Sequence, residues 1–132
     1  MPHAGAMLLL DRVERWNEHS VLCRARSHLD PANPLRRDGR LAGLCGIEYG
    51  LQAAALHGAL RAGGVAQRAG YAASLRSVTL GVARLDDAAL GELSVEARLE
   101  AQERFGMVYG FEIRSQADAV LLSGHASIAL PR

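Results

Sequence analysis

Residues 41–60 decide the fold, and they read LAGLCGIEYGLQAAALHGAL. Glu48 is the one charged residue between Arg40 and Arg61. A stretch with so little charge predicts a helix buried on nearly every side, over about residues 44–62. A carboxylate buried in such a helix is costly unless it is paired, hydrogen-bonded or protonated. Glu48 is therefore a candidate for chemistry.

Six strand-like runs surround the predicted helix. Two precede it and four follow it, at residues 7–15, 20–28, 71–84, 92–103, 105–116 and 119–130. Turn-forming residues at 103–106 and 116–118 join the last three runs. Because an apolar helix has to be covered, we expect an α+β fold. In it, a curved antiparallel sheet of about six strands wraps one long central helix, in a single domain over residues 1–132.

Composition excludes several classes of protein. Of the 132 residues 49% are apolar and 22% charged, and the formal net charge is +1. These values are typical of a globular domain and give no global field for nucleic acid or an anionic membrane. Gln52 and His57 join Glu48 in the apolar stretch, which therefore predicts a core helix rather than a membrane span.

The two cysteines and the N-terminus bear on the compartment. Cys23 and Cys45 lack the close spacing of a metal site or a disulfide framework. We expect free buried thiols, which fits a reducing cytoplasm. The first residues also lack the basic and apolar regions of a signal peptide. No motif calls for a metal or another cofactor, and we expect neither.

Three motifs resemble those of one enzyme family. Residues 2–13 read PHAGAMLLLDRV, with a Pro-His turn ahead of an apolar run that ends in Asp-Arg-Val. Asn33-Pro34 follows, and residues 46–53 read GIEYGLQA, with Glu and Gln four residues apart. In this order the motifs resemble bacterial 3-hydroxyacyl-acyl carrier protein dehydratases, most of all the divergent branch of aryl-polyene gene clusters. The resemblance implies a hotdog fold, dehydration of a 3-hydroxyacyl thioester in fatty-acid or polyene-type biosynthesis, and an acyl carrier protein as partner.

One motif departs from the family pattern. The typical dehydratase has Gly-His-Phe-Pro in its active-site loop, and that histidine is the catalytic base. The corresponding residues here are Gly39-Arg40-Leu41-Ala42, in a shorter loop. Arginine cannot act as a base at neutral pH. The usual histidine is therefore absent, and Arg40 stands near its place.

The resemblance assigns roles around the helix start. Dehydration needs a base for the C2 proton and an acid for the leaving hydroxyl. Glu48 matches the family's acid, and Gln52, one turn later, could orient it. Gly43 and Gly46 permit close backbone approach, and N–H groups there could donate to the thioester carbonyl. Tyr49 is expected to line an acyl tunnel with aliphatic side chains.

The base is open at this stage. His3 is a candidate, because the N-terminal turn lies near the helix start in hotdog proteins, but a structural residue that merely packs is the favoured interpretation. His28, His57 and His125 have structural interpretations. In the family, one active site takes its histidine from one chain and its glutamate from the other. A subunit without that histidine could still supply Glu48 to a paralogous partner.

Arginines offer further alternatives. Glu48 could be a structural carboxylate neutralised by Arg40 or Arg76. Arg36, Arg37 and Arg40 form an exposed basic loop that could contact an acidic carrier protein and the phosphopantetheine phosphate. A merely solvated loop is the alternative.

The sequence therefore supports three hypotheses. The first is a dehydratase, either a homodimer or a heterodimer with a paralogous hotdog protein, that pairs sheet edges into one continuous sheet. The second is a catalytically weak scaffold subunit that stabilises an active partner. The third is an acyl thioesterase, in which the helix carboxylate activates water.

Overall fold

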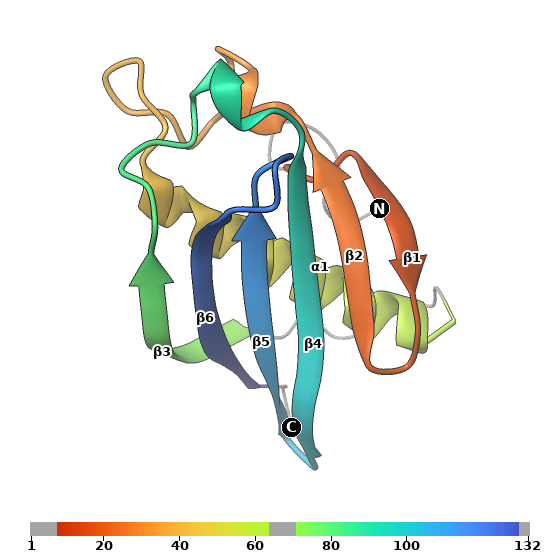
Figure 1. The fold of residues 1–132 in the computed structure, drawn as a ribbon. Helices are drawn as coiled ribbons and strands as arrows, with labels where there is room; N and C mark the ends of the chain where they lie inside the picture. The colour runs from red at the N-terminus through yellow and green to blue at the C-terminus, as the bar shows by residue number, and fades with distance from the viewer. Residues whose placement is uncertain (1–7, 64–70, 130–132) are drawn as a thin grey trace.

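The structure is a computed structural model that describes residues 8–63 and 71–129. Six strands surround one long helix (Figure 1). The strands are β1 (Arg12–Trp16), β2 (Ser20–Ala25), β3 (Tyr71–Leu80), β4 (Leu93–Glu103), β5 (Gly106–Arg114) and β6 (Val120–Ala129). The long helix is α1 (Gly46–Arg61), and the short 3-10 helices are η2 (Ser27–Leu29), η3 (Gly43–Cys45) and η4 (Ala88–Leu90).

The strands form one antiparallel sheet in the order β1-β2-β4-β5-β6-β3. α1 lies across one face and packs mainly on β4 and β5 (Figure 1). The fold predicted from the sequence, a sheet around a central helix, is confirmed. Both β1 and β3 are edges of this sheet.

Besides β2, which ends at Ala25 rather than residue 28, two strands are shorter than the sequence predicts. β1 begins at Arg12 rather than residue 7, and the N–H of Leu9 instead bonds to the side chain of Gln52 in α1. β3 ends at Leu80 rather than residue 84, because residues 83–85 hydrogen-bond to residues 41–43 ahead of the helix. In both places a chain segment leaves the sheet to hold the start of α1.

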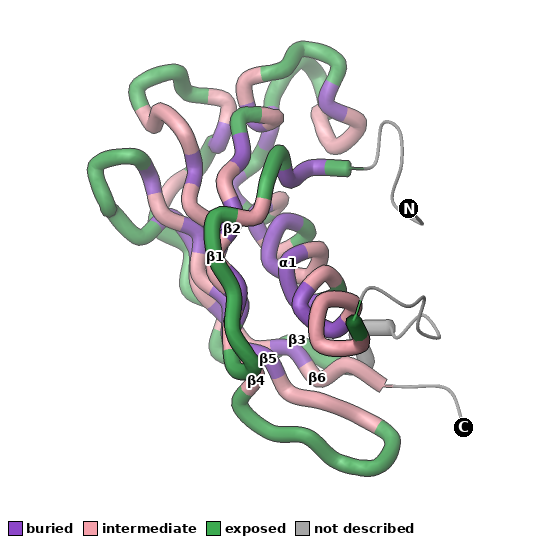
Figure 2. The backbone as a smooth tube through the Cα atoms, turned by 90° about the vertical axis from the view of Figure 1, so that its right-hand side faces the viewer, coloured by how far each residue is buried: buried purple, intermediate pink, exposed green. Residues whose placement is uncertain are grey.

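The core lies between α1 and the sheet, where buried residues of both elements face each other (Figure 2). Tyr49, Ala53 and Ala54 contribute from the helix. Gly50 is required here, since a Cβ at this position would overlap the ring of Phe111 in β5. The small residues of the helix therefore serve close packing against the sheet.

Both cysteines are free thiols, as expected. Cys23 is buried in β2, and burial raises the pKa of its thiol to about 11. Cys45 is half-buried at the end of η3, and burial raises its pKa as well. Among residues 8–63 and 71–129, no helix is long and apolar enough to cross a membrane.

Candidate active site

Glu48 lies in the first turn of α1, and its side chain is exposed in the single subunit. The expectation of a buried carboxylate is therefore wrong for this chain by itself. The ion pair with Arg40 or Arg76 is also absent, since none of the ion pairs among the described residues includes Glu48. The carboxyl group is exposed at a helix start, and no described residue supplies it with an ion pair.

Tyr49, the next residue, points the opposite way into the core. It is 0% exposed, and its hydroxyl lies 2.7 Å from Oγ of Ser27 and 3.2 Å from Nδ2 of Asn33. Ser27 in turn donates to the carbonyl of Leu9 at 2.7 Å. The phenol therefore donates to Ser27 and accepts from Asn33. Tyr49 joins the helix to η2 and the following loop, and in this subunit its hydroxyl is not free for a substrate.

Gln52 ties the N-terminal segment to the same part of the helix. Its Oε1 accepts a hydrogen bond from the N–H of Leu9 at 2.9 Å. This contact fixes the segment that leads from residue 8 into β1. The predicted role of Gln52, orienting the carboxyl of Glu48, stays a prediction. His3, the candidate base, lies outside the described residues.

The glycine amides at the helix start are already engaged. The N–H of Gly43 donates to the carbonyl of Ala83 at 2.8 Å, and that of Gly46 donates back to η3. These two amides are therefore engaged within the subunit, and the prediction that other N–H groups at the helix start bind the thioester carbonyl stays a prediction. Leu44 was not predicted, yet no acceptor for its N–H occurs among the described residues. Leu44 is also 53% exposed, one turn before Glu48.

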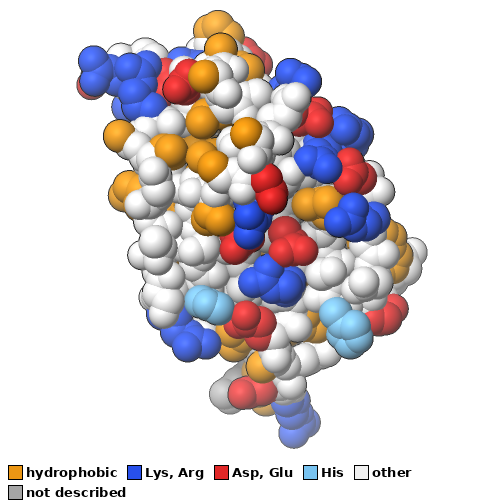
Figure 3. Space-filling view, in the orientation of Figure 1, with side chains coloured by type: hydrophobic (Ala, Val, Ile, Leu, Met, Phe, Trp, Pro, Cys, Tyr) orange, Lys and Arg blue, Asp and Glu red, His pale blue; other side chains and the backbone are white. Residues whose placement is uncertain are grey.

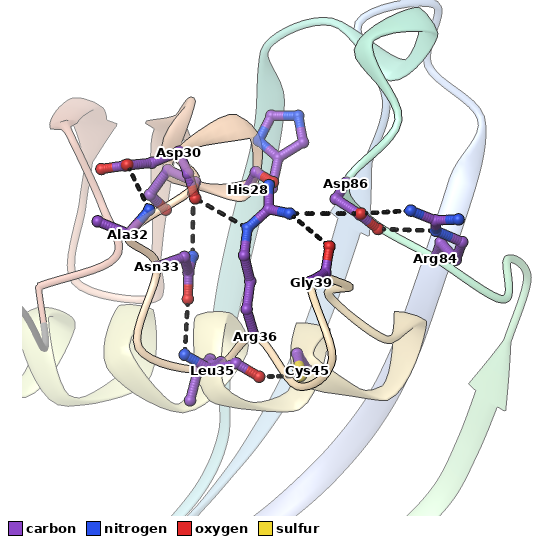
Figure 4. A network of polar contacts seen from close by, with 11 residues as sticks. His28, Asp30, Ala32, Asn33, Leu35, Arg36, Gly39, Cys45, Arg84 and Asp86 are labelled. Carbon is purple, nitrogen blue, oxygen red and sulfur yellow. Dashed lines mark hydrogen bonds and ion pairs between the residues drawn. The ribbon is translucent and has the colours of Figure 1, made fainter.

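The basic loop is only partly exposed. Arg37 and Arg40 are exposed, as predicted, and their backbones bond to each other across the turn, at 2.8 and 3.0 Å. Arg36 is turned inward, with only 16% of its side chain exposed. The expectation that Arg36 is an exposed contact residue is wrong, because its guanidinium donates hydrogen bonds to backbone carbonyls within the subunit (Figure 4).

His28, His57 and His125 all lie outside the first turn of α1. His57 is fully buried, with ring nitrogens 2.7 Å from the hydroxyl of Tyr109 and 2.9 Å from the carbonyl of Asn17. His28 is also fully buried. Burial lowers the pKa of both imidazoles. His125 lies on β6, 2.8 Å from Glu100 of β4. Their structural interpretation fits these contacts.

Three leucines of β3 and η3 are exposed. Leu75 and Leu80 of β3 are 44% and 45% exposed, and Leu44 of η3 is 53% exposed. Leu80 reaches the helix start, since its Cδ1 lies 2.9 Å from where a Cβ on Gly43 would stand. We call Leu44, Leu75 and Leu80 the apolar edge. Charged groups instead cover the open face of the sheet (Figure 3). Exposed apolar patches of this kind mark interaction sites.

Comparison with known proteins identifies the family of this chain. The family model for ApeP-like proteins, described as the ApeP dehydratase, matches residues 1–132. This chain belongs to the ApeP-like dehydratase family. None of the curated proteins compared with it matches. The resemblance drawn from the sequence motifs, to hotdog dehydratases of the aryl-polyene branch, is confirmed.

Solved structures share the fold of this ApeP-like chain. The dehydratase heterocomplex ApeI:P from Xenorhabdus doucetiae is 23% identical, with a TM-score of 0.81 over 100% of this chain and 88% of that one. AziG from S. sahachiroi is 17% identical, with a TM-score of 0.67 over 92% and 90%. A mutant of thioesterase SAV0944 from Staphylococcus aureus is 12% identical, with a TM-score of 0.66 over 89% and 90%. Dehydratases and thioesterases thus share this hotdog fold.

Proposed function

We propose that this chain is one subunit of a heterodimeric hotdog dehydratase that converts a 3-hydroxyacyl thioester into a 2-enoyl thioester on an acyl carrier protein. One observation carries the proposal. Glu48 is exposed at the start of the central helix and belongs to no ion pair among the described residues, and the apolar edge, with Leu44 one turn before Glu48, is exposed as well. A second subunit on that edge would cover Glu48 and complete the site around it.

Glu48 acts as the acid in this proposal. A base removes the C2 proton, the C3 hydroxyl leaves, and Glu48 gives that hydroxyl its proton, so that water and the enoyl thioester are the products. Contact with a second subunit would remove water from around the carboxyl group and enclose it with the substrate. The N–H of Leu44, one turn away, has no acceptor among the described residues and is suited to donate to the thioester carbonyl as negative charge develops there.

The base comes from the partner in this proposal. His28 and His57 are locked in the core, and Arg40 stands where the family loop has its histidine. The ApeI:P structure from Xenorhabdus doucetiae is a dehydratase heterocomplex. By analogy, the partner here is a paralogous hotdog protein that retains the loop histidine and places it opposite Glu48.

The carrier protein docks near the exposed arginines. Arg37 and Arg40 project from the loop that leads to η3 and α1. Carrier proteins are acidic and present a phosphopantetheine phosphate, so guanidinium groups beside the site entrance would raise the rate of encounter. This contact is electrostatic and predicts a KM for the carrier-protein substrate that rises with ionic strength.

Reconstitution tests the function. The chain is purified alone, its paralogous hotdog partner alone, and the two together, and each sample receives a 3-hydroxyacyl carrier protein. Mass spectrometry of the acyl group then detects loss of water. We expect rapid dehydration by the mixture and little by this chain alone. Dehydration by the partner alone at the same rate would make this chain a scaffold, and release of free acid without an enoyl product would make it a thioesterase.

A further inference from the structure

Arg36 is the centre of a polar network beneath the basic loop (Figure 4). Its Nε donates to the carbonyl of Asp30 at 2.9 Å, and Nη1 donates to the carbonyl of Gly39 at 3.0 Å. Nη2 donates to the carbonyl of His28 at 3.3 Å, and Nη1 lies 3.4 Å from the carboxylate of Asp86. One guanidinium therefore links three segments. They are η2 with the residue that follows it, the tip of the basic loop at Gly39, and the connection between β3 and β4 that carries Asp86.

Asp86 anchors this network from the other side. Only 4% of its side chain is exposed, and its carboxylate also accepts two hydrogen bonds from Arg84, at 3.0 and 2.6 Å. The Arg84 guanidinium holds the pKa of Asp86 well below its usual range. The carboxylate is thus a fixed negative charge. Because Arg84 would remain bound to it, removal of the Arg36 guanidinium does not leave Asp86 unpaired.

A second set of contacts joins Asp86 to the start of the helix. The N–H of Leu85 donates to the carbonyl of Leu41, and the N–H of Gly43 donates to that of Ala83, both at 2.8 Å. The segment that carries Asp86 therefore lies against residues 41–43, which lead directly into α1. The Arg36–Asp86 contact closes a ring. It holds the loop to the same segment that holds the helix start.

We propose that Arg36 is a positioning residue for the dehydratase site. It fixes the loop that carries Arg37 and Arg40 relative to the helix start that carries Glu48. The inference rests on the proposed function, and it reverses the role that the sequence suggested for Arg36. The four acceptors lie in three segments of the chain, and the planar guanidinium with its five N–H donors reaches all of them. A lysine ammonium would keep the charge but not the fork of contacts.

Kinetics of the reconstituted heterocomplex separate positioning from contact. We expect Arg36→Lys and Arg36→Gln to lower kcat by a similar factor, about 10- to 100-fold, because a misplaced loop loses productive geometry. Arg37→Gln should instead raise the KM for the carrier-protein substrate, and Arg37→Lys should largely restore it. If Arg36→Lys behaves like wild type, or if Arg36→Gln changes only a salt-sensitive KM, Arg36 is a contact residue and the proposal fails.

Loop order provides a readout that does not depend on activity. The amides of Arg37 and Arg40 bond to each other's carbonyls across the loop, so their hydrogen exchange reports whether the loop is closed. In Arg36→Lys we expect faster exchange at both amides and faster tryptic cleavage after these residues. The matched change Arg104→Lys, at the exposed β4–β5 turn, should alter neither. Unchanged hydrogen exchange in Arg36→Lys would overturn the positioning role of Arg36, whatever the activity of the complex. A wild-type complex that dehydrates nothing would refute the proposed function and leave the exchange test of Arg36 intact.

Discussion

The hydroxyl of Tyr109 lies 2.7 Å from Nδ1 of His57, with the two rings edge to face at 83°. The other ring nitrogen, Nε2, lies 2.9 Å from the carbonyl of Asn17. A carbonyl can only accept, so Nε2 carries the proton and Nδ1 accepts from the tyrosine. The imidazole is therefore held neutral in one tautomer. It joins α1 and β5 to the β1–β2 turn and is a structural residue.

Loss of the Tyr109 hydroxyl should destabilise the chain. Tyr109→Phe leaves a buried imidazole nitrogen without its donor, and we expect a loss of about 1–3 kcal/mol in the free energy of unfolding. Urea denaturation followed by circular dichroism measures it. The double variant Tyr109→Phe/His57→Leu removes both partners and should be more stable than Tyr109→Phe alone. Equal stability of Tyr109→Phe and wild type would show that the hydrogen bond contributes nothing.

Stability should fall in mild acid. Burial places the pKa of His28 and His57 in the folded chain below the ordinary value of 6.5. As the pH drops through about 6.5, these histidines take up protons in the unfolded chain but not in the folded chain. Proton binding therefore stabilises the unfolded state, and the free energy of unfolding falls. The free energy of unfolding continues to fall until the pH reaches the lowered pKa values of the folded chain. Above about pH 7 these two groups do not make the free energy of unfolding depend on pH.

Urea midpoints between pH 8 and pH 5 test this expectation. The decline below pH 6.5 should be shallower in His57→Gln than in wild type. A midpoint that rises toward pH 5 would contradict the direction assigned to both imidazoles.

Gly50 should not tolerate a methyl group. Its added Cβ would overlap the ring of Phe111, and overpacking of this kind typically costs about 1–3 kcal/mol. Gly50→Ala should lower the urea midpoint despite the better helix propensity of alanine. A second change, Phe111→Leu, makes room and should recover part of the loss. Gly50→Ala with wild-type or higher stability would mean that the helix can shift away from the sheet.

The apolar edge should be needed for assembly but not for folding. Leu80→Gln replaces an exposed leucine and should change the free energy of unfolding by about 0.5 kcal/mol or less. We expect the same change to weaken the heterocomplex in size-exclusion chromatography with light scattering. Trp16→Gln, on the opposite edge strand β1, should leave assembly intact. If Trp16→Gln dissociates the complex and Leu80→Gln does not, the partner occupies the other edge.

The fold could be predicted well from the sequence, for physical reasons that lie in the chain itself. Low charge and small residues in 41–60 require a helix that packs closely on its neighbours, and Gly50 against Phe111 shows that packing. Alternation along residues 93–103 identifies a strand by itself. The ends of β1 and β3 were misplaced because Leu9 and Ala83 bond to distant residues, Gln52 and Gly43, and no local pattern reports such contacts.

The site could be predicted only in part. One charge in an apolar stretch is typical of a buried helix, and equally of a helix whose uncovered side meets another subunit. Glu48 is exposed in this subunit, which fits the proposed second case, and a single sequence does not separate the two. Arg36, Arg37 and Arg40 likewise look alike as a loop of basic residues. Arg36 turns inward toward three backbone carbonyls and toward Asp86, which lies far along the chain, and no local pattern reports that set of contacts.

The most direct test of the central claim is the dehydration rate of the reconstituted heterocomplex with Glu48→Gln. The substitution is close to isosteric and exposed in the subunit, so assembly and unfolding should match wild type. We predict a fall in kcat of about 10²- to 10⁴-fold, the usual contribution of a general acid. A complex that assembles normally and dehydrates the 3-hydroxyacyl thioester at the wild-type rate would contradict the assignment of Glu48 as the acid.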